Sequence, residues 1–355
     1  MNNSKALIGM SGGVDSSVAA LLAKKQGYSC IGATMQLHDF ACGGSSDVRD
    51  AAEVAQRLGI SHIVLEQQSA FRREVINPFV RDYENGQTPN PCIRCNQHLK
   101  FGVMLEQALS IGCDYVVSGH YARIRRDPET GRYLLYKAAD KAKDQTYFLA
   151  CLNQTQLAHI LFPLGGLTQQ EVRSIAEKNN LITARKRDSQ DICFVPDGDY
   201  AVFLERYTGK TYPAGAYLDL DGNVIGSHQG AVRYTLGQRK GLGIALGAPA
   251  YVCSKDMVRN TVTLGPNEAL FSPALRAGDW NWFPFPELTE PLDVTVKIRH
   301  SQKESPARVY PEADGFARVE FAVPQRTVTP GQAVVLYRGD DVVGGGTIAQ
   351  PLSSL

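Results

Sequence analysis

Hydrophobic and polar positions in the first half of the chain follow, in turn, the patterns of buried strands and amphipathic helices. Residues 6–10 form an uninterrupted apolar run, which predicts a buried strand. From Ser16 onward, Val18, Leu21 and Leu22 recur at helical spacing and predict a helix with one apolar face. The same alternation predicts strands over residues 29–37, 61–65 and 114–118, and helices over about 47–58, 70–83, 101–108 and, as a pair, 153–179.

Strands that alternate with helices in this way form a parallel sheet with right-handed crossovers and helices on both faces. Such sheets bind ligands at the carboxyl ends of their strands. We therefore expect the loop after residue 10 to lie at the binding edge, with Met35 beside it. A methionine packed in the core is the alternative interpretation of Met35.

The pattern changes after Tyr207, where helical spacing disappears and Gly, Val, Thr and Tyr become frequent. Residues 217–225 predict a hairpin, because Asp221-Gly222 is a strong turn signal. Residues 278–286 are rich in Trp and Pro and predict a linker or the entry to a domain. Short strands predicted at 292–298, 307–310, 317–321, 333–337 and 342–348 indicate a small barrel.

The fold class predicted by these patterns is α/β: a Rossmann-like parallel-sheet domain followed by two smaller β-rich domains, the last a small β-barrel. We expect the domains to span residues 1–207, 208–277 and 278–355. A chain of 355 residues is long enough for three domains, and its hydrophobic content of 43% supports a sizeable core.

Composition and charge limit where the protein is expected to reside and which partners it can bind. No apolar run approaches the roughly 20 residues that span a bilayer, and the N-terminus enters a strand without a signal peptide. We therefore expect a cytoplasmic protein with no membrane partner. The net charge is only +1, so a nucleic-acid partner would need a local basic patch, for which Arg123, Arg125 and Arg126 are candidates.

The loop at residues 9–16 joins the first strand to the first helix and contains three glycines, three hydroxyl or carboxylate side chains and no lysine. Glycines let the backbone approach an anion closely, and the helix N-terminus supplies free N–H groups and a favourable dipole. The loop therefore predicts a phosphate cradle. It is not a Walker A loop, because no Gly-Lys-Ser/Thr follows. An ordinary glycine turn is the alternative.

The eight cysteines are too sparse for a disulfide scaffold, so catalytic, metal-binding or buried cysteines are expected. Cys95 follows a loop with two prolines and lies just ahead of a predicted helix, which should lower its thiol pKa and make it a candidate nucleophile. A structural zinc pair with Cys92 is the alternative, although His98 alone does not complete such a site. Cys193 is flanked by apolar residues, and a core cysteine is its alternative interpretation.

The loop SGGVDS resembles that of the PP-loop ATP pyrophosphatase superfamily. Together with TPNPCIRCN, SGHYAR, KDQTYFL, DSQDICF, GSHQG, YTLGQRKGLGI and TPGQAVV, it makes the chain resemble the tRNA-specific 2-thiouridylase family over nearly its whole length. The resemblance implies an enzyme, a tRNA-uridine 2-sulfurtransferase. It would adenylate the C2 oxygen of the wobble uridine with ATP, release AMP and pyrophosphate, and put sulfur in place of the oxygen.

By the same resemblance, Asp15 is a catalytic residue and a Mg²⁺ ligand. Cys193 carries a persulfide, and Cys95 is its partner, which either releases sulfide or forms a Cys95–Cys193 disulfide. A sulfur-relay or cysteine desulfurase protein would donate the sulfur. The resemblance assigns ATP binding to Gly9, Met10, Ser11, Gly12, Gly13, Val14, Asp15, Ser16, Met35 and Gly119.

The resemblance also implies contacts with the anticodon stem-loop of tRNA, with recognition by shape and by bases turned out of the stack. It assigns tRNA binding to Asn90, Pro91, Cys92, His120, Lys143, Asp144, Gln145, Arg299, His300 and Gln332.

Cys92 departs from the family pattern, since many members have Asp at this position. Related tRNA thiolases hold a 4Fe-4S cluster on a Cys-x-x-Cys pair and a distant Cys, so a cluster on Cys92, Cys95 and Cys193 is the alternative route. A PP-loop ligase or amidotransferase acting on another carbonyl would need neither Cys95 nor Cys193. A non-catalytic RNA-binding or redox-sensing protein would not need Asp15.

Overall fold

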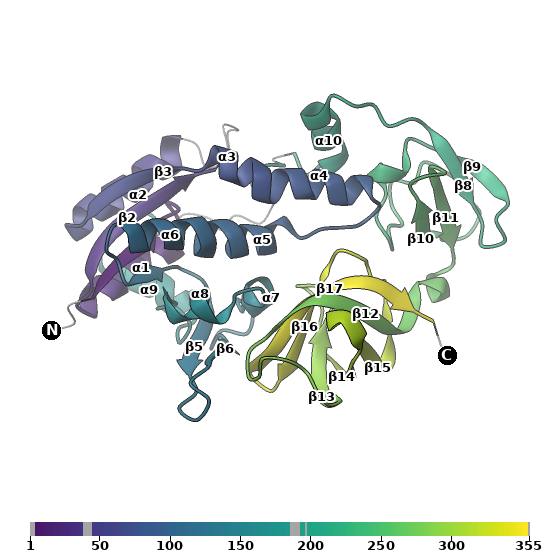
Figure 1. Ribbon diagram of the computed structural model, residues 1–355. Helices are drawn as coiled ribbons and strands as arrows, with labels where there is room; N and C mark the ends of the chain where they lie inside the picture. The colour runs from purple at the N-terminus through teal and green to yellow at the C-terminus, as the bar shows by residue number, and fades with distance from the viewer. Residues whose placement is uncertain (1–3, 38–44, 185–191, 196, 354–355) are drawn as a thin grey trace.

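The computed structural model describes residues 4–37, 45–184, 192–195 and 197–353, and places them in three β-sheets with flanking helices (Figure 1). The first sheet is parallel, with five strands in the order β3-β2-β1-β4-β7. This confirms the predicted parallel-sheet domain. Its strands are β1 (Lys5–Gly9), β2 (Ser29–Gln36), β3 (Ser61–Glu66), β4 (Tyr115–Val117) and β7 (Ile160–Leu161).

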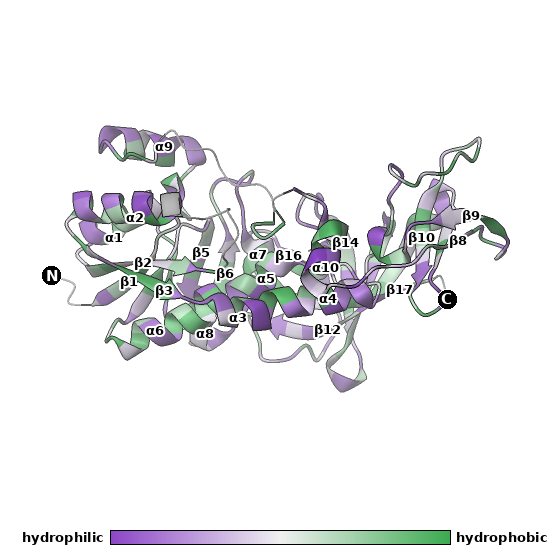
Figure 2. Cartoon of the chain, turned by 90° about the horizontal axis from the view of Figure 1, so that it is seen from above, coloured by the Kyte–Doolittle hydropathy of each residue, from purple (hydrophilic) through white to green (hydrophobic). Residues whose placement is uncertain are grey.

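Helices cover both faces of this sheet, because alternate residues of a strand point to opposite faces. Ala6 and Ile8 of β1 pack in one core with α1 (Val14–Lys25), α2 (Ser45–Leu58) and α9 (Gln169–Lys178). Leu7 packs in the other core with α6 (Met104–Ser110). Figure 2 shows α1, α2 and α9 on one side of the sheet and α6 with α8 (Gln154–Ala158) on the other.

Two long helices lie side by side beyond the sheet, and each contains a π-helical stretch (Figure 1). Junction residues such as Arg72 and Cys95 keep right-handed helical dihedrals, so each helix is continuous. π-helical turns occur often at functional sites, because they reorient the side chains of a helix. One helix comprises α3 (Gln68–Phe71), η1 (Arg72–Ile76) and α4 (Asn77–Glu84); the other comprises α5 (Pro91–Arg94), η2 (Cys95–Val103) and α6.

The central part of the chain forms a mixed four-stranded sheet in the order β10-β11-β8-β9. The predicted hairpin is confirmed, because β8 pairs with β9 antiparallel and Gly222 has a φ of 87° in the turn. The helix α10 (Tyr200–Thr208) precedes this sheet. Its elements are β8 (Gly215–Leu218), β9 (Val224–His228), η3 (Ala231–Arg233), β10 (Tyr251–Asp256), β11 (Thr261–Gly265) and η4 (Asn267–Leu270).

The last part of the chain is an antiparallel barrel, as predicted, closed by pairing of β12 with β17. Residues 278–286 are not a linker, because β12 runs through Trp282, and Trp282 and Phe283 are buried. The predicted boundary at residue 278 falls inside β12, so we propose to place it before Phe271. The barrel elements are β12 (Phe271–Trp282), β13 (Leu292–Lys297), β14 (Ser305–Pro311), η5 (Ala313–Gly315), β15 (Ala317–Arg326), β16 (Ala333–Arg338) and β17 (Asp341–Leu352).

A hairpin from the first domain extends the barrel sheet. β6 (Tyr133–Lys137) pairs with β17, and β5 (Ala122–Arg126) pairs with β6. The sequence pattern did not predict these strands. Within the described ranges, no helix is both long and apolar enough to cross a membrane.

Candidate active site

The loop between β1 and α1 is held in shape by its own hydroxyl groups. The Ser11 N–H donates to the Ser16 Oγ across 3.2 Å, and that hydroxyl lies 3.2 Å from the Gly13 carbonyl, to which it donates. Gly12 has a φ of +71°, and a Cβ there would lie 2.6 Å from the Asp47 carbonyl oxygen. Only glycine fits this conformation and this space, so the predicted cradle is built as a tight backbone loop at a helix N-terminus.

The end of the neighbouring strand β4 closes onto this loop. A Cβ on Gly119 would lie 2.8 Å from the Ser16 backbone nitrogen, so this close approach also requires glycine. Two residues later, the buried Tyr121 hydroxyl donates to Asp15 Oδ1 across 2.8 Å. Two predicted ATP-binding segments therefore meet at one sheet edge. Met35 is partly buried and packs against the core clusters that flank this edge.

His120 lies in the interior beside the loop. Its Nδ1 is 2.7 Å from the Ser118 Oγ, and its ring packs against Phe101 and Phe162. Burial lowers the pKa of the imidazole well below its ordinary value, and the positive charge of Lys100 lowers it further. The ring is therefore neutral at physiological pH, and its predicted contact with tRNA stays a prediction.

The two prolines predicted that Cys95 lies ahead of a helix, but the structure places it inside one. Asn90 caps the helix by accepting a hydrogen bond from the Cys92 N–H, and Pro91 occupies the first turn, where a missing N–H costs nothing. Cys95 is therefore inside the helix and only 9% exposed. Burial raises the pKa of its thiol, with Lys100 acting in the opposite direction. The predicted low thiol pKa is wrong for this conformation.

Cys193 is exposed and is not the core cysteine that the alternative interpretation described. Its neighbour Phe194 anchors it, because that ring is buried against Phe71, Phe79 and Phe203 at centroid distances of 5.6, 5.1 and 5.2 Å. The basic run at residues 185–191 that precedes it lies outside the described residues.

The thiols of Cys92, Cys95 and Cys193 gather in one place from two distant segments. Although Cys193 is exposed as a residue, desolvation of its sulfur by surrounding protein atoms, followed by the effects of the neighbouring Cys95 and Cys92, raises the pKa of the thiol to about 12. Burial also raises the pKa of Cys92. All three are free thiols.

Lys100 is the functional candidate that sequence reasoning missed. Its positive charge acts on all three of these thiols and on His120, and it therefore links the cysteine cluster to the loop edge. In an ordinary α-helix, residues five apart do not share a face, so the sequence spacing of Cys95 and Lys100 does not predict that their side chains interact. The π-helical stretch η2 bonds residue i to residue i+5 and brings them into register.

The donor groups differ in how well they fit metal ions. Asp15 and the hydroxyls of Ser11 and Ser16 offer the oxygen ligands that Mg²⁺ prefers. Among the residues that the structure describes, no group of three or more His, Cys, Asp or Glu side chains is placed to hold a single metal ion, and a 4Fe-4S cluster on the three thiols stays an alternative prediction.

The barrel contacts the segment that leads into the helix of Cys92 and Cys95. This helix comprises α5, η2 and α6, and we call it the cysteine helix. The Thr88 N–H donates to the Pro330 carbonyl across 3.0 Å, and Gln332 Nε2 donates to the Thr88 carbonyl across 2.6 Å. Arg299 Nη2 donates to the Thr327 carbonyl across 3.1 Å, and His300 packs on Phe148 with ring centroids 4.4 Å apart.

The segment at residues 143–145 is also fixed by protein contacts. Gln145 Oε1 accepts from the Tyr121 N–H across 2.9 Å, and Asp144 Oδ1 accepts from the Ala138 N–H across 2.8 Å. With Lys143, these residues lie next to the loop edge. Of the predicted tRNA-binding residues, Gln332 therefore contacts the segment before the cysteine helix and Gln145 contacts the segment beside the phosphate loop, and the contacts of all of them with RNA stay predictions.

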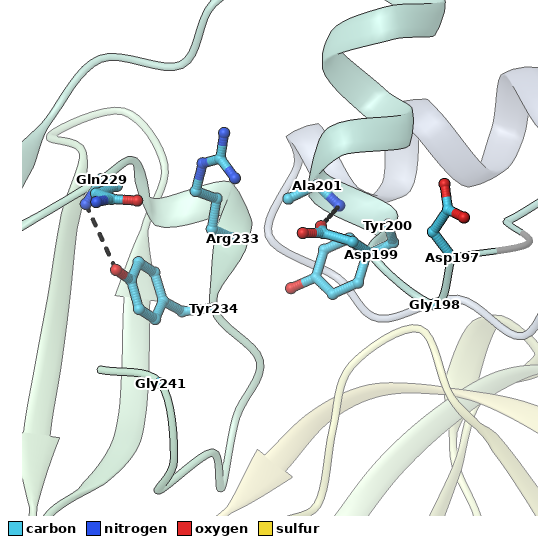
Figure 3. Close-up of a pocket in the computed structure, with 9 residues that line it drawn as sticks. All are labelled: Asp197, Gly198, Asp199, Tyr200, Ala201, Gln229, Arg233, Tyr234 and Gly241. Atoms are coloured by element: carbon cyan, nitrogen blue, oxygen red, sulfur yellow. Dashed lines mark hydrogen bonds between the residues drawn. The ribbon is translucent and has the colours of Figure 1, made fainter. Parts of the chain in front are cut away.

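A polar cavity of about 380 Å³ lies between α10 and the central sheet (Figure 3). Asp197 and Asp199 face Gln229 and Arg233 across it. Asp199 caps α10, and Arg233 pairs with Glu205 at 2.6 Å, so these two charged groups of the cavity already have structural partners. None of the predicted site residues lines this cavity.

Models of known families match three consecutive parts of the chain. They are described as tRNA methyl transferase HUP domain for residues 4–197, tRNA methyl transferase PRC-barrel domain for 201–266, and Aminomethyltransferase beta-barrel domain for 272–348.

Known proteins match over nearly the full chain. The tRNA-specific 2-thiouridylase MnmA of Acetivibrio thermocellus is 50% identical over 98% of this chain and 100% of its own length. That of Clostridioides difficile is 47% identical over 99% of each. A solved 4-thiouridine synthetase–RNA complex with bound ATP aligns with 57% of this chain and 50% of its own, at 14% identity and a TM-score of 0.37, which is too low to carry an argument.

Proposed function

We propose, because this chain belongs to the tRNA-specific 2-thiouridylase family, that it replaces the C2 oxygen of the wobble uridine of tRNA by sulfur in an ATP-dependent reaction. A uracil carbonyl is a poor electrophile, and its oxygen is a poor leaving group. Transfer of AMP to that oxygen, with loss of pyrophosphate, makes the oxygen leave readily.

The loop at residues 9–16 would bind the phosphates of ATP, with Gly12 and Gly119 allowing the backbone to come close. Tyr121 fixes the orientation of Asp15, which would hold Mg²⁺ together with the hydroxyls of Ser11 and Ser16. The ion, when bound, neutralises phosphate charge. The neutral His120 buried beside the loop adds no positive charge to this edge.

Sulfur would then reach C2 from Cys193, which is exposed and can be loaded by a donor protein that carries a persulfide. The outer sulfur attacks C2, and AMP leaves with the oxygen. The Cys95 thiolate attacks the Cys193 Sγ, so the sulfur–sulfur bond breaks and its electron pair stays with the sulfur on the uridine. Alternatively, Cys95 attacks first and releases sulfide, which attacks C2. Both routes end in a Cys95–Cys193 disulfide.

One observation carries this proposal: the charge of Lys100 acts both on the thiols of Cys95 and Cys193 and on His120 at the edge of the phosphate loop. A phosphate loop with His120 at its edge, and two free thiols that feel the same positive charge, suit activation of a carbonyl followed by sulfur attack. The family models are described by methyl transfer, which needs neither a phosphate loop nor a thiol pair.

Nucleoside mass spectrometry of tRNA from cells that lack this protein tests the proposal. We expect 2-thiouridine at the wobble position to disappear and to return on expression of the wild-type chain, but not of the Cys193→Ser chain. Retention of the thiolated nucleoside in cells without the protein would contradict the proposal. If the tRNA from these cells lacked a methylated nucleoside instead, the result would favour methyl transfer, the reaction named in the descriptions of the family models.

A further inference from the structure

The cysteine cluster has one more thiol than the proposed reaction uses. Cys95 and Cys193 suffice to transfer sulfur and to end as a disulfide, and Cys92 has no part in that step. It nevertheless lies close enough to interact electrostatically with both, so its position beside them calls for a chemical role.

Helix geometry pairs Cys92 with Cys95. The Cys95 N–H donates to the carbonyls of both Pro91 and Cys92, so the turn that joins the two cysteines is tightened toward i→i+3 bonding. In a turn of that kind, side chains three apart lie one above the other. A disulfide needs Cβ atoms roughly 1–2 Å closer than ordinary helix neighbours, an adjustment within reach of the first turn of a helix.

The three thiols differ in exposure, and this difference suits them to different roles. Cys92 and Cys193 are exposed, whereas Cys95 is buried. A disulfide between Cys95 and Cys193 occupies the sulfur that must accept the next persulfide. A disulfide between Cys92 and Cys95 leaves Cys193 free and places one oxidised sulfur at the surface, within reach of a reductant.

We propose that Cys92 is the resolving thiol of this enzyme, which moves the disulfide left by each turnover from Cys95–Cys193 to Cys92–Cys95. The inference depends on the proposed function. The Cys92 thiol loses its proton, and the thiolate attacks the Cys95 Sγ. The Cys92–Cys95 bond forms, the Cys95–Cys193 bond breaks, and Cys193 leaves as a thiolate with the electron pair, which takes up a proton from the solvent in place of the one that Cys92 released there. The exchange involves no net oxidation. An external dithiol then reduces Cys92–Cys95 and is itself oxidised to a disulfide.

Lys100 assists the exchange electrostatically. Its positive charge favours the thiolate forms of the attacking Cys92 and the departing Cys193. Formation of the new disulfide also removes the neighbouring thiolates that raise the pKa of Cys193, so that sulfur becomes a better leaving group than in the resting protein.

Disulfide mapping after one turnover tests the inference on the wild-type protein. Persulfide-loaded enzyme is mixed with ATP and unmodified tRNA without reductant, quenched in acid, alkylated and digested for mass spectrometry. We expect a Cys92–Cys95 disulfide and alkylated Cys193 in most molecules. A Cys95–Cys193 disulfide with alkylated Cys92 would overturn the relay. Absence of 2-thiouridine from the tRNA would instead overturn the proposed function, so the two failures are distinguishable.

Turnover kinetics give a second test. Cys92→Ser should still form 2-thiouridine in the first turnover, keep the Cys95–Cys193 disulfide, and slow at least about tenfold in later turnovers, relative to its own first turnover, with a dithiol reductant. Cys113→Ser is the matched control, since Cys113 is a buried cysteine outside the cluster, and it should turn over normally. Unchanged multiple turnover in Cys92→Ser would contradict the proposal. The disulfide-mapping experiment uses the wild-type protein, so its outcome does not depend on whether the Cys92→Ser variant folds.

Discussion

The Tyr121 hydroxyl donates a hydrogen bond to Asp15 Oδ1 across 2.8 Å, and this contact joins the segments that follow two neighbouring strands of the parallel sheet. Tyr121 is only 1% exposed, so the bond is shielded from water on the phenol side. Gln145 accepts from the Tyr121 N–H and holds the other end of the same residue. The carboxylate in the phosphate loop is thus positioned by a side chain that the loop itself does not contain.

Tyr121→Phe removes this bond with little change of volume. A buried hydrogen bond to a charged group contributes about 1.5–3 kcal/mol, so the rate of tRNA-dependent pyrophosphate release should fall roughly tenfold or more. Pyrophosphate release at varied ATP concentration measures the effect. Tyr217→Phe is the matched control, because Tyr217 donates a buried hydrogen bond to the Leu242 carbonyl in the central sheet. Equal rates in the two variants would contradict the positioning role.

Gly119→Ala should disrupt the phosphate loop. The new Cβ would lie 2.8 Å from the backbone of Ser16, and backbone cannot move aside as a flexible side chain can. We expect ATP affinity, measured by calorimetry, to fall roughly 5- to 160-fold, since overpacking strain of about 1–3 kcal/mol falls on the bound conformation. Gly166→Ala, where a Cβ meets no atom within 4 Å, should bind ATP normally. Normal ATP binding by Gly119→Ala would contradict the claim that the close approach at Gly119 shapes the phosphate loop.

The alkylation rate of Cys193 should depend on pH in a way that reports its raised pKa. Burial raises that pKa to about 12, so the folded protein keeps the thiol protonated at neutral pH. Because the thiolate is the reactive form, the alkylation rate should rise about tenfold per pH unit from pH 7 to 10 without levelling off. A free thiol levels off above its pKa of about 8.5. A plateau for Cys193 below pH 8 would show that the resting thiol is already activated.

The sequence predicts the parallel sheet, the hairpin and the barrel because their strands carry continuous or alternating apolar runs, as residues 6–10 show. It also places Gly12 and Gly119 at strand ends. It mispredicts Cys95, because local rules treat two prolines as helix breakers, whereas Asn90 caps the helix and lets Pro91 begin it. It does not reveal Lys100, because only the π-helical stretch aligns residues five apart.

Lys100→Met should make the cysteine cluster less reactive. Loss of the positive charge removes the interaction that lowers the pKa of Cys92, Cys95 and Cys193, so each thiolate becomes rarer at a given pH. We expect alkylation at pH 8 to slow about three- to tenfold, the effect of a rise of roughly half to one pKa unit. Lys100→Arg should restore most of the rate by keeping the charge. Lys178→Met, on the surface helix α9, should leave it unchanged. Equal rates in all three variants would exclude Lys100 from the cluster.

Lys143→Ala tests the predicted RNA contact of the segment beside the loop. Loss of one phosphate contact should weaken tRNA binding and reduce the slope of log affinity against log salt by about 1. Fluorescence anisotropy with labelled tRNA at several salt concentrations measures both quantities. Lys25→Ala changes a lysine in the last turn of α1 and is the control. An unchanged salt slope would mean that Lys143 does not contact the phosphate backbone.

Reconstituted sulfur transfer tests the central claim most directly. Purified protein, ATP, unmodified tRNA and a persulfide donor are combined, and the wobble nucleoside is identified by mass spectrometry alongside AMP and pyrophosphate. We predict 2-thiouridine with AMP in equal amount from the wild type, and no thiolated nucleoside from Cys95→Ser or Cys193→Ser. Thiolated tRNA from either serine variant, or none from the wild type, would contradict the account.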